Sequence, residues 1–249
     1  MSAGKLEAEL GKWSAAGTRP QLWWRDDDAV AVTPELERLA HITGNANVEV
    51  MLAVIPAHVD ERLADYLAQH NHLKPCLHGW AHKNHAPAGE KKCELGHHRE
   101  LDVVLGEIAA GRQRLSDLFG SDLMPVLVPP WNRMREDLAT RLSEAGIKAF
   151  STFAHKRSHP EIQVNTHVDV MNWKAAGGAA GKDLDQVLDE LAAALGTSRA
   201  NGGYPVGVLT HHLAHDHAAW SSLSGLLAYA ELEWVPFEEA LGDQPRTTS

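Results

Sequence analysis

The sequence is poor in cysteine, in long apolar runs and in positive charge. Its 249 residues include only two cysteines, Cys76 and Cys93, too few for a disulfide framework, so we expect a reducing compartment. No apolar run approaches the ~18 residues of a spanning helix, and the first residues form no apolar signal segment, so we expect a cytoplasmic protein without a membrane partner. The net charge of −10 at pH 7 disfavours nucleic acid as a partner.

Short apolar runs alternate along the chain with segments of helical period. The runs, which we predict to be strands, cover residues 22–25, 48–55, 75–77, 123–128, 147–153, 164–171 and 206–210. The helical segments include residues 101–119, 138–146, 184–195 and 223–229, with glycines predicted to close three of them at Gly120, Gly146 and Gly196. Such alternation predicts a parallel sheet with helical crossovers. About seven units favour an α/β fold with a single-domain barrel over residues 22–242, a helical arm over 1–21 and a C-terminal tail over 243–249.

Polar side chains follow the ends of several predicted strands. These are the aspartates Asp26, Asp27 and Asp28, the histidines His78 and His82, the segment Pro129-Pro130-Trp131, Asp169, and His211. The His-x3-His spacing alone is weak, because sixteen histidines repeat it at His155/His159 and His211/His215. Position after a buried strand singles out the first pair. In a barrel the strand ends form one rim, so we expect these residues to meet in one pocket.

Together these residues resemble the polysaccharide deacetylase family (carbohydrate esterase family 4 type), metal-dependent amidohydrolases that include chitin, chitooligosaccharide and peptidoglycan deacetylases. The aspartate run resembles the family's Asp-Asp motif, and His78-Gly79-Trp80-Ala81-His82 resembles its His-[Ser/Thr]-x-x-His metal motif. Three further segments resemble its Arg-x-Pro-aromatic, Asp-x-x-Asp-Trp and Leu-x-His motifs: Pro129-Pro130-Trp131, Asp169-Val170-Met171-Asn172-Trp173 and Leu209-Thr210-His211. The resemblance runs from Trp24 to about His211 and implies a distorted (β/α) barrel.

The resemblance implies a hydrolase with a zinc ion, or another divalent metal ion, held by His78, His82 and one aspartate. Amide hydrolysis needs an activated water and a proton for the departing amine, which a carboxylate and a histidine supply. A second aspartate would be the base and His211 the acid. Asp169 would orient His211 and support its protonated form. A backbone N–H near Trp131 would help to hold the oxyanion.

The run of three aspartates leaves two registers open. If Ala29 stands for the family's glycine after the pair, Asp27 is the base and Asp28 the metal ligand. If Arg25 stands for the residue before the pair, the roles move to Asp26 and Asp27. We favour the first register, because a small residue after the pair fits a tight turn.

Two positions depart from the family's pattern. Val128 stands where the family has an arginine that orients the base, although Arg25 or Arg133 could take its place. Asn172 stands for the second aspartate of the fourth motif. We expect the insertion over residues 83–97, which contains Glu94, to be either a lid or an exposed loop.

The expected substrate is an N-acylated sugar, an oligosaccharide or a similar small amide. The residues expected to bind it are Trp80, Pro130, Trp131, Trp173 and Leu209, several of which offer flat rings that could stack on a sugar. Two alternatives stay open, a non-catalytic carbohydrate-binding barrel and a metal hydrolase of a non-sugar C–N bond. The oligomeric state is left open as well.

Overall fold

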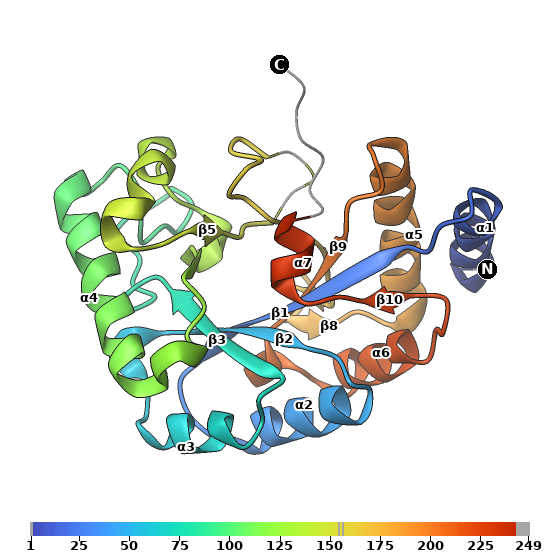
Figure 1. The fold of residues 1–249 in the computed structure, drawn as a ribbon, viewed down its shortest axis with the longest axis horizontal. Helices are drawn as coiled ribbons and strands as arrows, with labels where there is room; N and C mark the ends of the chain where they lie inside the picture. The colour runs from blue at the N-terminus through green and yellow to red at the C-terminus, as the bar shows by residue number, and fades with distance from the viewer. Residues whose placement is uncertain (1, 154, 156, 243–249) are drawn as a thin grey trace.

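The computed structural model describes residues 2–153, 155 and 157–242, so the expected C-terminal tail lies outside the described residues. Its centre is a sheet in which seven parallel strands follow the order β5-β4-β3-β2-β1-β9-β6 (Figure 1). These strands are β1 (Gln21–Ala29), β2 (Val50–Val54), β3 (Leu73–His78), β4 (Val126–Val128), β5 (Ala149–Phe150), β6 (Thr166–Asp169) and β9 (Val206–Thr210). The short β10 (Glu233–Trp234) pairs with the start of β1, and β7 (Met171–Asn172) forms a hairpin with β8 (Ala180–Gly181).

The sheet curls until its two edge strands meet. Phe150 at the end of β5 forms a bridge with Gln163, and Phe153 forms one with Thr166 at the start of β6. These isolated bridges are sparser than the ladders between the inner strands, so the result is an incomplete, distorted barrel. It agrees with the α/β barrel of about seven parallel strands that the sequence predicts.

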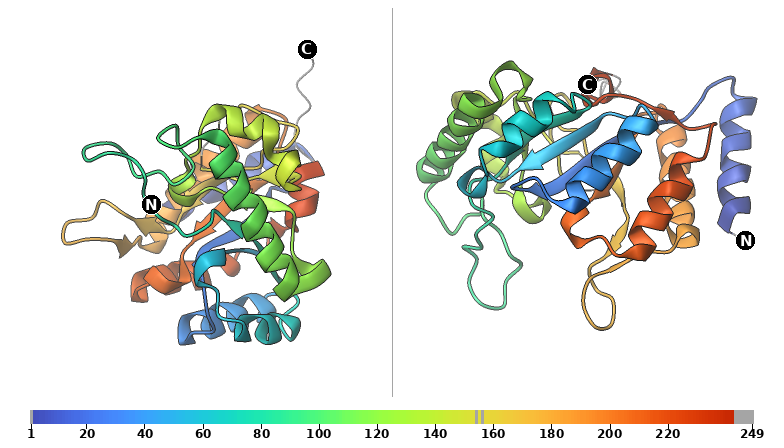
Figure 2. Two further views of the ribbon diagram at one scale, coloured as in Figure 1. Left: turned by 90° about the vertical axis from the view of Figure 1, so that its left-hand side faces the viewer. Right: turned by 90° about the horizontal axis from the view of Figure 1, so that it is seen from below.

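Most of the helices cover the outside of the curled sheet (Figures 1 and 2). The α-helices are α1 (Ser2–Ala15), α2 (Pro34–Asn45), α3 (Arg62–Ala68), α4 (Leu101–Phe119), α5 (Leu184–Ala200), α6 (His217–Leu227) and α7 (Phe237–Gly242). The 3-10 segments are η1 (Pro56–His58), η2 (Gly120–Asp122), η3 (Pro130–Asn132), η4 (Glu136–Ala145) and η5 (His212–Ala214). None of the described helices is long and apolar enough to cross a membrane.

The apolar side chains form two cores, one on each face of the sheet. The larger core lies between the strands and the outer helices, while the smaller one fills the inside of the barrel near the starts of the strands. Phe237 of α7 packs edge-on against Trp23 in this inner core, with ring centroids 5.3 Å apart. Because the amino end of the inner face is filled in this way, a pocket can open only at the carboxyl end.

Three of the differences from the sequence-based expectation concern β1, η4 and α5. β1 does not end at Arg25, because all three aspartates belong to the strand. The segment expected as an α-helix before Gly146 is the 3-10 segment η4. α5 does not stop at Gly196 but continues to Ala200. A Cβ added to Gly196 would lie 3.6 Å from the carboxyl carbon of Glu9, so this glycine faces α1 in the contact between two helices instead of ending one.

Candidate active site

The consecutive aspartates at the end of β1 lie on opposite faces of the sheet. Successive side chains of a strand point in opposite directions, so neighbouring aspartates must separate. Asp27 lies on the inner face with Arg25, whereas Asp26 lies on the outer face and contacts His212 of η5. Asp28 has a left-handed backbone (φ 73°) that turns its carboxylate toward the end of β3.

Asp28 meets the two histidines that follow β3. Its Oδ1 lies 3.0 Å from Nε2 of His78 and 3.3 Å from Nε2 of His82. Within the described part of the chain, this trio is the group of metal-ligating side chains whose donor atoms all lie within 4.8 Å of one another. Two imidazoles and a carboxylate form a donor set that suits zinc and leaves a position free for water and substrate.

The orientation of the His78 ring indicates that this group needs a cation. His78 is buried, and its Nδ1 lies 2.9 Å from the carbonyl oxygen of Val128, which only an N–H can satisfy. In the neutral ring Nε2 then carries a lone pair that faces the carboxylate of Asp28. A metal ion or a proton has to lie between these two atoms, so the residues fit a divalent ion.

Without an ion, a proton takes this role, and the direction of the pKa changes agrees. Burial alone would lower the pKa of His78, but the hydrogen bond and charge of Asp28 raise it. Burial alone would raise the pKa of Asp28, but the hydrogen bond from His78 and the charges of the nearby histidines hold it well below its ordinary value. The pKa of His82 is lowered, first by burial and then by the charge of His78.

Glu94 holds the loop that carries the two histidines. Its side chain is fully buried, and its carboxylate accepts hydrogen bonds from the backbone N–H groups of Trp80 (3.2 Å), Ala81 (2.8 Å) and Lys83 (3.3 Å). Gly79 (φ 58°) makes room for it, because a Cβ there would lie 2.1 Å from Oε2 of Glu94. Glu94 is therefore neither exposed nor part of a lid. In the sequence, the only hint of this role is that Glu94 directly precedes the apolar Leu95, which is also fully buried.

Asp27 is fixed by Arg25, its neighbour on the inner face of β1. Nη2 of Arg25 donates to Oδ2 of Asp27 at 3.0 Å, and Nε lies 2.9 Å from Oδ1. The guanidinium also donates to Ser151 (2.8 Å) and to the side-chain oxygen of Asn132 (2.6 Å). Arg133 points elsewhere and donates to the backbone oxygen of Lys92. Arg25, and not Arg133, thus makes the contact with Asp27, while Val128 contributes the carbonyl that orients His78.

His211 completes the inner group from the end of β9. Its Nε2 lies 3.9 Å from Oδ2 of Asp27, and its Nδ1 has no hydrogen-bond partner within the described residues. Trp173 packs edge-on against its ring, with centroids 4.7 Å apart. Asp169 accepts hydrogen bonds from the indole of Trp173 (2.8 Å) and from the backbone of Met171, and it makes none with His211. Asp169 and His211 therefore share Trp173 as a neighbour, and the charge of His211 acts on Asp169 without a hydrogen bond between the two.

Backbone strain is concentrated around this group. Five described residues other than glycine have a positive φ, and four of them are Asp28, His82, Trp131 and Asn132. Such residues cost free energy and persist only where surrounding contacts hold them, which is typical of functional sites. Here the ring of Trp131 packs on His82 at 4.3 Å and the side chain of Asn132 is bound to Arg25.

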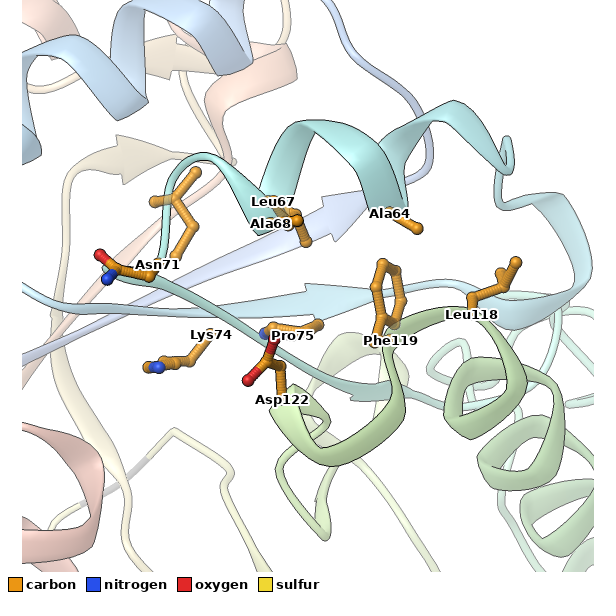
Figure 3. A pocket seen from close by; sticks show the side chains of 10 residues that line it. Ala64, Leu67, Ala68, Asn71, Lys74, Pro75, Leu118, Phe119 and Asp122 are labelled. Carbon is orange, nitrogen blue, oxygen red and sulfur yellow. The ribbon is translucent and has the colours of Figure 1, made fainter.

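These groups open into one cavity of about 740 Å³ at the carboxyl ends of the strands. Eight of the residues expected from the sequence line it: Asp27, Asp28, His78, His82, Trp131, Asp169, Trp173 and His211. A hollow at the other end of β3, between α3 and α4, has a volume of only about 80 Å³ (Figure 3). It is flanked by Leu67, Leu118 and Phe119, and no histidine lines it. The cavities at the two ends of β3 therefore differ in chemistry as well as in volume.

Four expected site residues lie outside this cavity. Asp26 is on the outer face of β1, where it binds Thr210 and His212, so it cannot reach a substrate. Trp80 faces α4 beside Gly111, and Leu209 is buried within β9. Pro130 is buried against the backbone of Gly79 and supports the histidine loop instead of contacting the cavity.

Neither protein-family models nor curated protein sequences match this chain. Solved structures do match, with TM-scores of 0.58 to an acetyl xylan esterase of family 4 from Clostridium thermocellum in complex with cobalt, and 0.56 to a peptidoglycan N-acetylglucosamine deacetylase. The matches cover 89% and 88% of this chain and 90% and 87% of those chains, at 14% identity. A mutant of a family 4 pseudoenzyme matches at a TM-score of 0.56 and 14% identity, over 92% of this chain and 69% of that one. The fold that the motifs imply is therefore confirmed.

Proposed function

We propose that this chain is a metal-dependent deacetylase that hydrolyses the acyl group, expected to be acetyl, from an N-acylated sugar, an oligosaccharide or a similar small amide. One observation carries the proposal. A metal-type donor set of Asp28, His78 and His82 shares a cavity with the arginine-held Asp27 and with His211, on a fold shared with family 4 carbohydrate esterases. These are the groups that amide hydrolysis requires.

Asp28, His78 and His82 would hold the ion, which we propose to be zinc or another divalent metal. A divalent ion supplies Lewis acidity for the acyl carbonyl and makes a water molecule more acidic. The chain's own contribution is orientation. The carbonyl of Val128 fixes the ring of His78, and Glu94 fixes the backbone between the histidines.

Asp27 would be the base that accepts the proton of the attacking water. The contacts with Arg25 hold its carboxylate on the inner face of β1 and compensate its charge in a buried place. His211 would be the acid that gives a proton to the departing nitrogen. A backbone N–H near Trp131 would donate to the oxyanion.

The two departures from the family's motifs do not oppose catalysis. Arg25 provides from β1 the guanidinium that Val128 lacks. Asn172 is exposed, and its side-chain oxygen accepts the backbone N–H of Lys174 at 3.1 Å, so it supports the local turn. The contact between Arg25 and Asp27 is an argument against the non-catalytic alternative, which rests on these two departures.

Two free thiols, buried Cys76 and half-buried Cys93, support a reducing compartment, so we propose cytoplasmic placement. In that compartment an oligosaccharide or glycoside is a more accessible substrate than a wall polymer.

The proposal is tested by metal analysis and acetate release on N-acetyl chitooligosaccharides, simple N-acetylated amines and acetylated xylan. We expect about one metal ion per chain and metal-dependent acetate release from an amide substrate. His211→Ala should lower turnover by about 10²–10⁴-fold and leave the metal content unchanged. Bound metal without acetate release from any substrate would favour the non-catalytic alternative, and release from the simple amines alone would favour the hydrolase of a non-sugar C–N bond.

A further inference from the structure

The rim of the cavity carries positive charge on three different loops. Lys92 belongs to the 83–97 insertion, Arg133 follows η3, and Lys174 lies in the turn between β7 and β8. All three line the cavity and are exposed. Figure 2 shows the insertion and the β7–β8 turn projecting from the same side of the molecule. Residues about 80 positions apart in sequence thus place cations around one opening.

The acidic residues that line the cavity are those of its floor, Asp27, Asp28 and Asp169. Asp27 is already compensated by Arg25, Asp28 by the metal ion or proton between it and His78, and Asp169 accepts hydrogen bonds from Met171 and Trp173. The rim cations are therefore not needed to neutralise the floor. In a chain with a net charge of −10, a mouth lined by three cations and, as far as the described residues show, by no acid is a local reversal of sign.

The amino groups of Lys92 and Lys174 have no carboxylate partner among the described residues. Elsewhere on the surface many cations are paired, as Lys182 is with Glu190 and Arg135 with Asp137, both within 3 Å. Nζ of Lys92 lies 5.9 Å from the ring centroid of Trp131, inside the cavity's border. Nη1 of Arg133 donates to the backbone oxygen of Lys92, so these two cations are held side by side.

Exposed aromatic rings accompany the cations. Phe153 and Trp173 are 41% and 48% exposed, and both line this cavity. Large apolar side chains of this exposure are few among the described residues, and a ring beside a cation suits a ligand with a flat apolar face and a negative group.

We propose that the substrate is an N-acylated amine that also carries an anionic group, a phosphate or a carboxylate, which Lys92, Lys174 and Arg133 bind while the acyl group lies over the metal-type cluster. This inference rests on the proposed deacetylase function. It adds that neutral N-acyl sugars are poor substrates, and that the selectivity comes from the rim and not from the catalytic floor.

The test compares matched substrates with and without the charge. The probes are the neutral methyl glycoside of N-acetylglucosamine, the 1-phosphate and 6-phosphate of N-acetylglucosamine, and N-acetylmuramic acid for the carboxylate. Acetate release gives kcat and KM, and calorimetry on the metal-loaded protein gives binding. We expect kcat/KM for at least one anionic probe to exceed that of the neutral glycoside by about tenfold or more. The preferred probe distinguishes phosphate from carboxylate.

The variants separate the rim from the floor. The double variant Lys92→Gln and Lys174→Gln should raise KM for the anionic probe by about tenfold, leave its kcat nearly unchanged and leave the neutral glycoside unaffected. Lys91→Gln is the matched control, since Lys91 is the exposed neighbour of Lys92 and does not line the cavity. Raising the ionic strength from about 0.05 M to about 0.5 M should weaken only the anionic probe.

Each outcome decides between the two proposals. Equal kcat/KM for neutral and anionic probes overturns the anionic substrate and leaves the deacetylase intact. Unchanged KM in the double variant overturns the role of the rim. If no probe is hydrolysed but an anionic probe binds selectively and the double variant abolishes that binding, the anionic site stands and the deacetylase fails. Neither hydrolysis nor binding of any anionic probe overturns the inference.

Discussion

Asp26 and Asp27 are adjacent in the chain, and each is buried beside a cationic partner, yet they occupy different environments. Asp27 faces the inside of the barrel with Arg25 and borders the cavity. Asp26 faces the outer helices, where it binds His212 and Thr210 in a place without access to solvent. One step along a strand therefore separates a group that can act on a substrate from a group that can only stabilise the fold.

The difference lies in what surrounds each pair. The carboxylate of Asp26 is saturated by the backbone and side chain of His212 and by the hydroxyl of Thr210. That of Asp27 is held on one side by Arg25 and has His211 at 3.9 Å across the cavity. A base must keep one side open, so only the inner pair meets the requirement for proton transfer.

Removing the negative charge of Asp27, the aspartate on the inner face, should have the largest effect on activity. Asp27→Asn removes the base but keeps the hydrogen-bonding shape, so turnover should fall by about 10²–10⁴-fold while the metal content stays the same. Asp28→Asn should instead lose the metal. Acetate release and elemental analysis of both variants measure this. The opposite pattern, with Asp28→Asn active and Asp27→Asn free of metal, would support the register in which Asp26 is the base.

Removing the negative charge of Asp26, the aspartate on the outer face, should instead lower the free energy of unfolding. Asp26→Asn leaves His212 buried without its counter-charge, which costs about 3–5 kcal/mol in comparable buried pairs. Denaturant unfolding measures the loss, and acetate release from the folded fraction should remain near that of the parent protein. A variant of full stability and no turnover would show that the outer aspartate takes part in the reaction.

A third variant tests whether Glu94, which does not line the cavity, contributes to the affinity for the metal. Glu94→Gln keeps the size of the side chain but weakens three hydrogen bonds to the histidine loop, so metal affinity should fall by about 10–100-fold. Competition with a chelator measures the affinity. Glu90→Gln is the control, because Glu90 lies on the same insertion and its carboxylate pairs, within the described part of the chain, with His98 alone. Equal affinity in the two variants would contradict a positioning role for Glu94.

The smallest expected effect is the pH dependence of the outer pair. Burial alone would lower the pKa of His212, but the charge and hydrogen bond of Asp26 raise it above the ordinary value of 6.5. Its contribution to stability is therefore complete below about pH 6.5 and is lost as the pH rises through the folded-state pKa. The difference in unfolding free energy between the parent protein and His212→Gln should narrow at alkaline pH. A constant difference from pH 6 to pH 9 would contradict the ion pair.

The sequence predicted the barrel and the gathering of polar groups at strand ends. Alternating strand and helix segments are visible in the sequence, and in a barrel the ends of parallel strands form one rim. The sequence favoured the register with Asp27 as the base because of the small Ala29 after the pair, and not because of the face of the strand on which each aspartate lies. The predicted strand ended at Arg25, so the alternation that separates Asp26 from Asp27 was not applied. The burial of Glu94 and its contacts with the histidine loop were not predicted, for another reason. Its burial depends on a contact across a loop, and periodicity carries no information about such contacts.

The hydrogen bonds from Trp80, Ala81 and Lys83 to Glu94 have a kinetic consequence. These three amide protons can exchange with deuterated solvent only when the insertion separates from the end of β3, so they should exchange together. The exchange rate of these amides in the apo protein therefore measures how often the histidine loop comes apart before any ion has bound.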